Sequence, residues 1–185
     1  SSLRGAVDRR ELQLVYQPRV TVDTFELAGV ECLVRWDHPQ FGTIRPEEFI
    51  AIAEETGVIE DIGRWMLEEA CRTVAVWRGR YERKFVACTS VTGRQLRDPQ
   101  LVQAIQDAIQ RYQLPADALQ VELSEASVID APETAHSVLK DLQRHGVRIG
   151  LEDFGTGHSS LGVIRRVPLN SMKLDRSLLA DLYTD

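Results

Sequence analysis

The chain has 185 residues, of which 43% are hydrophobic, and its 22 basic and 28 acidic residues give a net charge of −6. This length and apolar content are sufficient for one globular domain with its own core. The negative charge argues against a broad contact with duplex nucleic acid, although it leaves a small phosphorylated ligand open.

The cysteines Cys32, Cys71 and Cys88 are far apart and lack the spacing of a metal site. We interpret them as buried thiols of a reducing compartment. The sequence shows no signal peptide and no apolar run long enough to cross a bilayer, so we predict a cytoplasmic domain without a membrane segment.

The first third of the chain predicts two strands and two helices. Apolar and polar residues alternate over 12–18 and again over 27–36, which predicts a β-hairpin with its turn at 21–25. Proline and acids open a helix at Pro46, and Gly57 closes it. A long amphipathic helix follows, with this apolar stripe: Ile59, Ile62, Trp65, Met66, Ala70, Val74 and Trp77. We assign the two tryptophans of the stripe to the core rather than to a ligand platform.

The rest of the chain alternates strands and helices. The predicted strands are 85–91, 118–124, 147–153 and 169–175, and the predicted helices are 99–113, 130–145 and 159–166. Strands separated by helices favour a parallel sheet, and acids at strand ends favour an α/β fold of the βα-barrel type with its site at the top. Only about six strands are found, whereas an eight-stranded barrel needs roughly 250 residues, so we expect this chain to stop before closure.

The segment from Arg148 to Ser160 is the strongest candidate for a site. A buried strand leads into Glu152 and Asp153, and a loop with two glycines and three hydroxyls follows. Adjacent carboxylates repel each other unless a cation compensates, which favours Mg²⁺ or Mn²⁺. A helix N-cap is the alternative, because acids and serines are ordinary capping residues.

Polar residues also stand at the ends of the other strands. The full set is Glu31, Ser90, Glu122, Glu152, Asp153 and Lys173. In a barrel these ends converge, so the set could hold one or two hard cations and a water that the lysine polarises or deprotonates. A phosphodiester is the substrate expected at such a site.

These segments resemble the EAL-domain phosphodiesterases that act on cyclic di-GMP. The resemblance covers nearly the whole chain and rests on Tyr16-Gln17-Pro18, Glu31-Cys32-Leu33-Val34-Arg35-Trp36, Glu122-Leu123-Ser124-Glu125, Asp153-Phe154-Gly155-Thr156-Gly157 and Lys173-Leu174-Asp175-Arg176-Ser177. It implies a modified, TIM-like βα barrel whose first strand runs antiparallel, with cyclic di-GMP bound across the strand ends.

The resemblance also implies roles for single residues. The metal ligands are expected to be Glu31, Glu122 and Asp153, with Glu152 within reach of a metal. Lys173 is expected to activate the nucleophilic water, and Glu125 to hold the loop after the fifth strand. The ligand contacts are expected to be Gln17, Leu33 and Arg35, the last on a phosphate, which suits its forked guanidinium.

Three kinds of feature depart from the family pattern: one signature residue, two residues of the metal site, and the end of the chain. The signature alanine is Cys32, a small replacement of little consequence. A metal-binding asparagine is replaced by Ser90, and the first acid of the aspartate pair by Glu152, one methylene longer. Both changes are expected to hold a metal loosely.

The third departure is the missing end, because the family's last two strands and the residues they carry are not in this sequence. We therefore expect residues 1–185 to form a single EAL domain that is incomplete at its C-terminus. Its unpaired edge would then be covered by a partner chain, such as a second copy, or by a tail outside this sequence.

Two functions of different class follow. The first is a degenerate EAL domain that binds cyclic di-GMP or another protein and regulates with little or no hydrolysis. The second is an active phosphodiesterase that converts cyclic di-GMP to pGpG with Mg²⁺ or Mn²⁺. The altered Ser90 and Glu152 favour the first. A protein-interaction module that has lost the nucleotide is the weakest alternative, because Gln17 and Arg35 are retained.

Overall fold

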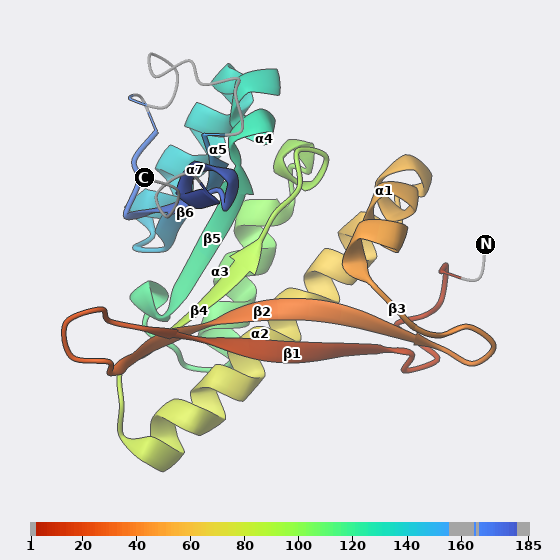
Figure 1. Ribbon diagram of the computed structural model, residues 1–185, viewed down its shortest axis with the longest axis horizontal. Coiled ribbons are helices and arrows are strands. Elements are labelled where there is room, and N and C mark those ends of the chain that lie inside the picture. Colours follow the sequence, from red (N-terminus) through yellow and green to blue (C-terminus); the bar gives the residue numbers. More distant parts are fainter. Residues whose placement is uncertain (1–2, 156–164, 166, 181–185) are drawn as a thin grey trace.

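The chain folds around one mixed sheet of seven strands (Figure 1). This computed structural model describes residues 3–155, 165 and 167–180. After a turn region at 3–10, β1 (Leu12–Val20) and β2 (Leu27–His38) pair antiparallel, and the short β3 (Gly42–Ile44) pairs with β2. The predicted hairpin is therefore confirmed, and so is the antiparallel first strand.

Two helices follow the hairpin. Helix α1 (Pro46–Thr56) begins at a proline, where no amide donor is needed, and ends at Gly57 in the left-handed conformation with φ 78°. Helix α2 (Ile59–Tyr81) has 23 residues and buries its apolar stripe. Both agree with the predicted helices. Trp65 and Trp77 are half-buried and pack against the edges of the core.

The remaining strands run parallel to β2 in the order β4, β5, β6 and β7. Their bounds are Val86–Ser90 for β4, Leu119–Ser124 for β5, Arg148–Phe154 for β6 and Ser171–Leu174 for β7. The helices are η1 (Gln95–Arg97), α3 (Leu101–Arg111), η2 (Ala116–Ala118), α4 (Glu125–Asp130), α5 (Pro132–Arg144) and α7 (Ser177–Ala180).

Two predicted helices differ from the observed ones. The helix predicted from residue 99 begins at Leu101, because the Asp98 carboxylate accepts the Gln100 amide at 2.9 Å in a turn just before it. The helix predicted over 130–145 is observed as α5, and the short α4, which was not predicted, comes directly before it. Pro132 disfavours the helical conformation at Ala131, which has φ −143° and separates the two. The helix predicted over 159–166 lies almost wholly outside the described residues.

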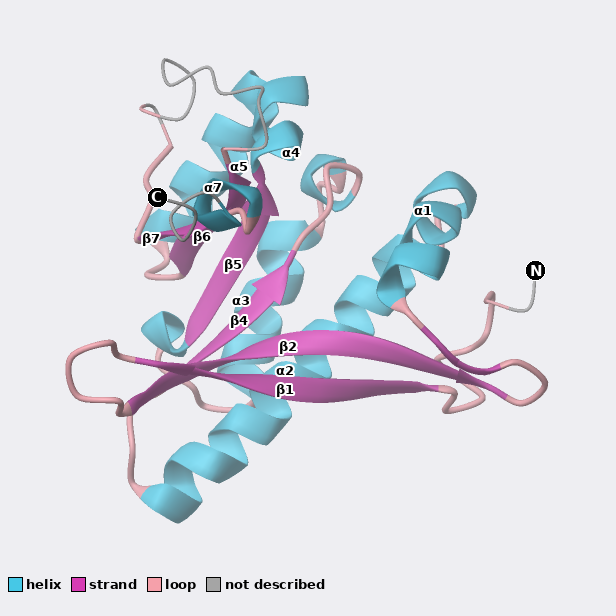
Figure 2. Ribbon diagram, viewed as in Figure 1, coloured by secondary structure: helices cyan, strands magenta, loops and turns pink. Residues whose placement is uncertain are grey.

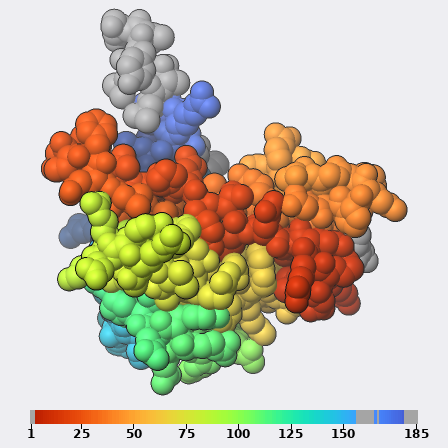
Figure 3. All heavy atoms as spheres, turned by 90° about the horizontal axis from the view of Figure 1, so that it is seen from below, coloured from red at the N-terminus to blue at the C-terminus, as the bar shows by residue number. Residues whose placement is uncertain are grey.

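Helices α2, α3 and α5 cover one face of the sheet (Figure 2). The main core lies between these helices and the strands, and a second cluster joins the N-terminal turn region, β2, α1 and the start of α2. On the surface seen in Figure 3, β1 borders α2. Tyr16 makes this contact by donating to the Thr73 hydroxyl at 3.0 Å and meeting the Trp77 ring edge-on at 4.8 Å.

The sheet is strongly curved. Lys173 on β7 contacts Glu31 on β2 at 2.7 Å, although β4, β5 and β6 lie between these strands. In a flat sheet the two strands would be roughly 19 Å apart, at about 4.8 Å per neighbouring pair. The face opposite the helices is therefore concave, and we call it the inner face.

Candidate functional site

The inner face carries many polar residues because they recur at alternate positions of its strands, as Gln120, Glu122 and Ser124 do on β5. On β2, Val30, Cys32 and Val34 are buried towards the helices, whereas the residues between them belong to the other face. Register places predicted site residues on this face of adjacent strands: Gln17 lies beside Glu31, Ser90 beside Glu122, and Glu152 beside Ser124, which was not predicted as a site residue. Residues far apart in the sequence thus share one surface.

Glu122 is the most deeply buried of the predicted metal ligands, at 1% exposure. Its Oε1 accepts from the Gln120 amide at 2.6 Å and from the Arg19 guanidinium, with which it forms an ion pair. Its Oε2 is buried without a hydrogen-bond partner among the described residues. Gly150 on the next strand leaves room for this side chain, because a Cβ there would lie 3.0 Å from Glu122 Cγ.

Glu31 and Lys173 form the contact that spans the sheet. The ammonium donates to both carboxylate oxygens, at 2.7 and 2.8 Å. Burial lowers the pKa of Lys173, but its bond to Glu31 and the nearby carboxylates outweigh this effect and leave that pKa above its usual value. The lysine is therefore an ammonium at neutral pH in this arrangement, which suits polarising a water better than deprotonating it.

Ser90 and Glu152, the two site residues that differ from those expected of the family, contact each other. The serine hydroxyl donates to Glu152 Oε2 at 3.0 Å. Burial raises the pKa of the Glu152 carboxyl, the Ser90 bond lowers it, and the charges of Glu122 and Asp153 raise it further. The net increase follows mainly from the burial of this carboxyl, to which the neighbouring acids add.

Asp153 and Glu125 lie where β6 ends. Asp153 is exposed and adopts a left-handed conformation with φ 57°, at an irregularity in the pairing of β6 with β7. Glu125 is 1% exposed, and its Oε2 accepts from the Gly155 amide at 3.1 Å. This contact ties α4 to the start of the loop after β6. The hydroxyls of that loop at 156–160 lie outside the described residues.

The predicted ligand contacts lie on the hairpin. Gln17 is exposed, Leu33 and Arg35 are half-buried, and the Arg35 guanidinium donates to the Val34 carbonyl at 2.8 Å. A cavity of about 310 Å³ opens where α1 and α2 meet the strand ends. Leu33, Ser90 and Glu152 are among the residues that line it. It therefore connects the ligand side of the predicted site with its acidic side.

The side chains of the inner face include the oxygen donors that a divalent cation needs, but they are not arranged around a single ion position. Carboxylate oxygens are the donors that Mg²⁺ and Mn²⁺ prefer, and Glu122 Oε2, which has no partner among the described residues, is an oxygen of this kind. Within the described ranges, no three acidic, histidine or cysteine side chains are close enough to hold an ion. Arg19 and Lys173 stand beside two of the acids instead.

Sequence reasoning missed Arg19 and Gln120, which both contact Glu122. The alternation of β5 held a signal for Gln120, because the residue two positions before a site residue lies on the same face of a strand. Arg19 had the same kind of signal, because it lies two positions after Gln17 on β1, but its contact with Glu122 depends on the curvature of the sheet.

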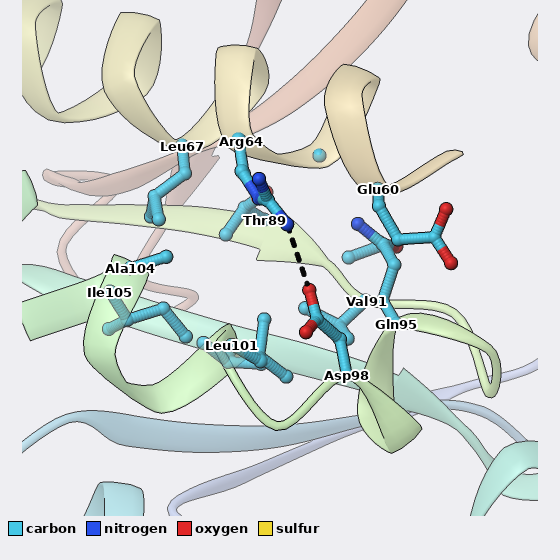
Figure 4. Close-up of a pocket in the computed structure, with 13 residues that line it drawn as sticks. Glu60, Arg64, Leu67, Thr89, Val91, Gln95, Asp98, Leu101, Ala104 and Ile105 are labelled. Carbon is cyan, nitrogen blue, oxygen red and sulfur yellow. Dashed lines mark hydrogen bonds and ion pairs between the residues drawn. The ribbon is translucent and has the colours of Figure 1, made fainter. Parts of the chain in front are cut away.

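A separate cavity lies on the other side of β4, between α2 and α3 (Figure 4). Its walls are mainly apolar, and Arg64 and Asp98 approach to 3.4 Å at one end. With a volume of about 30 Å³ it has room for roughly one water and none for a nucleotide. The inner face is therefore the candidate site.

A model of the EAL domain family matches residues 1–185. The chain belongs to the EAL domain family. It is 37% identical over 183 residues to the bifunctional diguanylate cyclase/cyclic di-GMP phosphodiesterase MucR of Pseudomonas aeruginosa, covering 99% of this chain and 27% of that protein. It is 36% identical over 183 residues to the cyclic di-GMP phosphodiesterase PdeR of Escherichia coli, with the same coverage of 99% and 27%.

Solved structures agree with this EAL assignment. A MucR phosphodiesterase in complex with c-di-GMP superposes with a TM-score of 0.93 at 36% identity, covering 100% of this chain and 74% of that one. The EAL fold predicted from the motifs is thus confirmed, whereas closure of the barrel is not seen, since β1 and β7 end the sheet of the described residues.

This EAL domain spans about a quarter of the length of the curated relatives named above. None of the helices in the described part of the chain is long and apolar enough to cross a membrane.

Proposed function

We propose that this EAL domain binds cyclic di-GMP on its inner face and acts mainly by binding, with little or no hydrolysis. One observation carries the proposal: acids expected to hold metal are held by groups of the chain itself. Lys173 binds Glu31, Arg19 binds Glu122, and Ser90 donates to Glu152. The acids are thus charge-balanced or hydrogen-bonded without a metal, while the ligand side of the face stays available.

The nucleotide is expected to lie along the hairpin and over the strand ends. Gln17 and Leu33 would contact it, and Arg35 would leave the Val34 carbonyl to pair with a phosphate, since a charge-assisted bond is stronger than one to a neutral carbonyl. A solved relative supports this ligand, because the MucR structure is a c-di-GMP complex. Binding of a protein partner, such as a second copy of this chain, stays a prediction.

Slow hydrolysis to pGpG is the second candidate, favoured by Glu122 Oε2, for which the described part of the chain supplies no partner. Glu31, Glu122, Glu152 and Asp153 would hold Mg²⁺ or Mn²⁺. A bound divalent ion supplies charge neutralisation for the phosphate and a more acidic water. Lys173 would orient that water by donating to its oxygen, and Glu125 would position the loop after β6 through Gly155.

Calorimetry with cyclic di-GMP tests both candidates. Titrations in EDTA and in Mn²⁺ are followed by chromatography of the recovered nucleotide. Binding in EDTA with no more than traces of pGpG in Mn²⁺ supports a binding domain. Rapid conversion to pGpG in Mg²⁺ or Mn²⁺ shows that the enzyme candidate is right, and an absence of heat at high nucleotide concentration rules out the nucleotide as ligand.

A further inference from the structure

Arg19 reaches from one edge of the sheet to its centre. It is paired with Gly29 on β2, and its Nη1 contacts Cys88 Sγ on β4 at 2.8 Å and Glu122 Oε1 on β5. Gly29 has no side chain on this face, and a Cβ there would lie 2.6 Å from the Val86 carbonyl oxygen. The arginine therefore crosses β2 over a glycine to reach the acid.

The two oxygens of Glu122 have different surroundings. Oε1 accepts from both Arg19 and Gln120, whereas Oε2 is buried and has no partner in the described part of the chain. A buried carboxylate is unfavourable without a counter-charge, and Arg19 is the cation in contact with it. Gln120 adds a hydrogen bond but no charge. Oε1 is thus saturated, and Oε2 stays open to a second cation.

We propose that Arg19 is a built-in counter-cation that neutralises Glu122 in the metal-free domain and competes with a divalent cation for that carboxylate. The inference rests on the metal role proposed above for Glu122. An ion approaching Oε2 meets the repulsion of a guanidinium already bound to the same group, and this repulsion is only partly screened at a site with little solvent. Arg19 therefore lowers the affinity for metal without being a ligand of either metal or nucleotide.

The test is calorimetric titration of Mn²⁺ alone into four proteins. Arg19→Gln removes the charge and keeps an amide donor, and Arg19→Lys keeps the charge. Arg111→Gln changes the net charge equally at an exposed pair with Glu68 on the helical side. We expect Arg19→Gln to bind Mn²⁺ about tenfold tighter than wild type, which corresponds to roughly 1.4 kcal/mol. Arg19→Lys should stay within about twofold of wild type, and Arg111→Gln should match it.

Each outcome decides the inference. The strongest support for the inference is Mn²⁺ binding by Arg19→Gln with no detectable binding by the other three proteins. Binding by Arg19→Gln that is no tighter than by Arg111→Gln overturns it, and so does an absence of binding by all four proteins. If Arg19→Gln melts below the assay temperature, Arg19→Met takes its place with the same expectation. A parallel titration of cyclic di-GMP in EDTA reports on nucleotide binding separately, because no metal is present there.

Discussion

The Ser90 hydroxyl donates to Glu152 Oε2 at 3.0 Å, although the two residues are 62 positions apart. A hydroxyl shorter than the asparagine expected at position 90 and an acid longer than the aspartate expected at position 152 meet across β5, the strand between β4 and β6. The extra methylene of Glu152 extends its carboxylate towards Ser90 and so compensates in part for the short serine side chain. The two departures are therefore one local arrangement rather than two separate defects.

This contact leads to a prediction about paired substitutions. In the full-length protein, Ser90→Asn together with Glu152→Asp should raise hydrolysis by at least about tenfold over the better single change, because residues that share one metal act as a unit. Glu152→Asp alone withdraws the carboxylate from Ser90 and should gain little. Rates of pGpG formation in Mn²⁺ measure this, and additive single effects would show that the residues act independently.

Arg35 should carry a large part of nucleotide binding. Arg35→Ala is expected to weaken binding of cyclic di-GMP by about 2 kcal/mol, the scale of one lost charge-assisted hydrogen bond. Arg45, which pairs with Glu48 at the exposed start of α1, supplies the control, and Arg45→Ala should leave the dissociation constant unchanged. Equal affinities of wild type and Arg35→Ala in calorimetry would remove Arg35 from the binding surface.

Trp77 should matter more for stability than Trp65. Its ring meets Tyr16 edge-on at 4.8 Å and Phe85 at 6.1 Å, and it is half-buried. Trp77→Ala should lower the free energy of unfolding by about 2–3 kcal/mol, less than the 3–5 kcal/mol of a fully buried aromatic, and Trp77→Phe should recover part of it. Urea denaturation measures the loss. If Trp65→Ala unfolds like wild type but loses a binding partner, that part of α2 is an interface.

The hydrogen bonds of Glu11 lead us to predict that the free energy of unfolding falls at acidic pH. Its carboxylate accepts from Arg9 at 2.6 Å and from the Trp36 indole at 3.1 Å, and these bonds lower the pKa of Glu11 to about 2 from 4.5. A lowered pKa means that the stabilisation is complete above about pH 4.5 and is lost as the pH falls towards 2.

Glu11→Gln should therefore melt at a lower temperature than wild type at pH 6, and the difference should shrink towards pH 2. Glu26→Gln, at an exposed acid before β2, should follow wild type at each pH. A constant difference between Glu11→Gln and wild type across this range would show that the charge of Glu11 is not the cause. Thermal unfolding followed by circular dichroism supplies the comparison.

Much of this fold follows from local signals in the sequence. The alternation over β1 and β2 predicts the hairpin, and Pro46 and Gly57 set the bounds of α1 because a proline suits a first helical turn and a glycine suits a left-handed cap. The three-residue β3 and the four-residue α7 escaped prediction, since neither is long enough to show a period.

The sequence by itself also predicted which residues form the candidate site, because the acids, Ser90 and Lys173 lie in strand segments whose motifs resemble those of EAL domains. Only the tertiary structure decided their partners. Arg19 and Glu122 are 103 positions apart, and Glu31 and Lys173 are 142 apart. Both pairs form because the twist and curvature of the whole sheet bring non-adjacent strands within reach of a long side chain, and no local pattern in the sequence encodes that curvature.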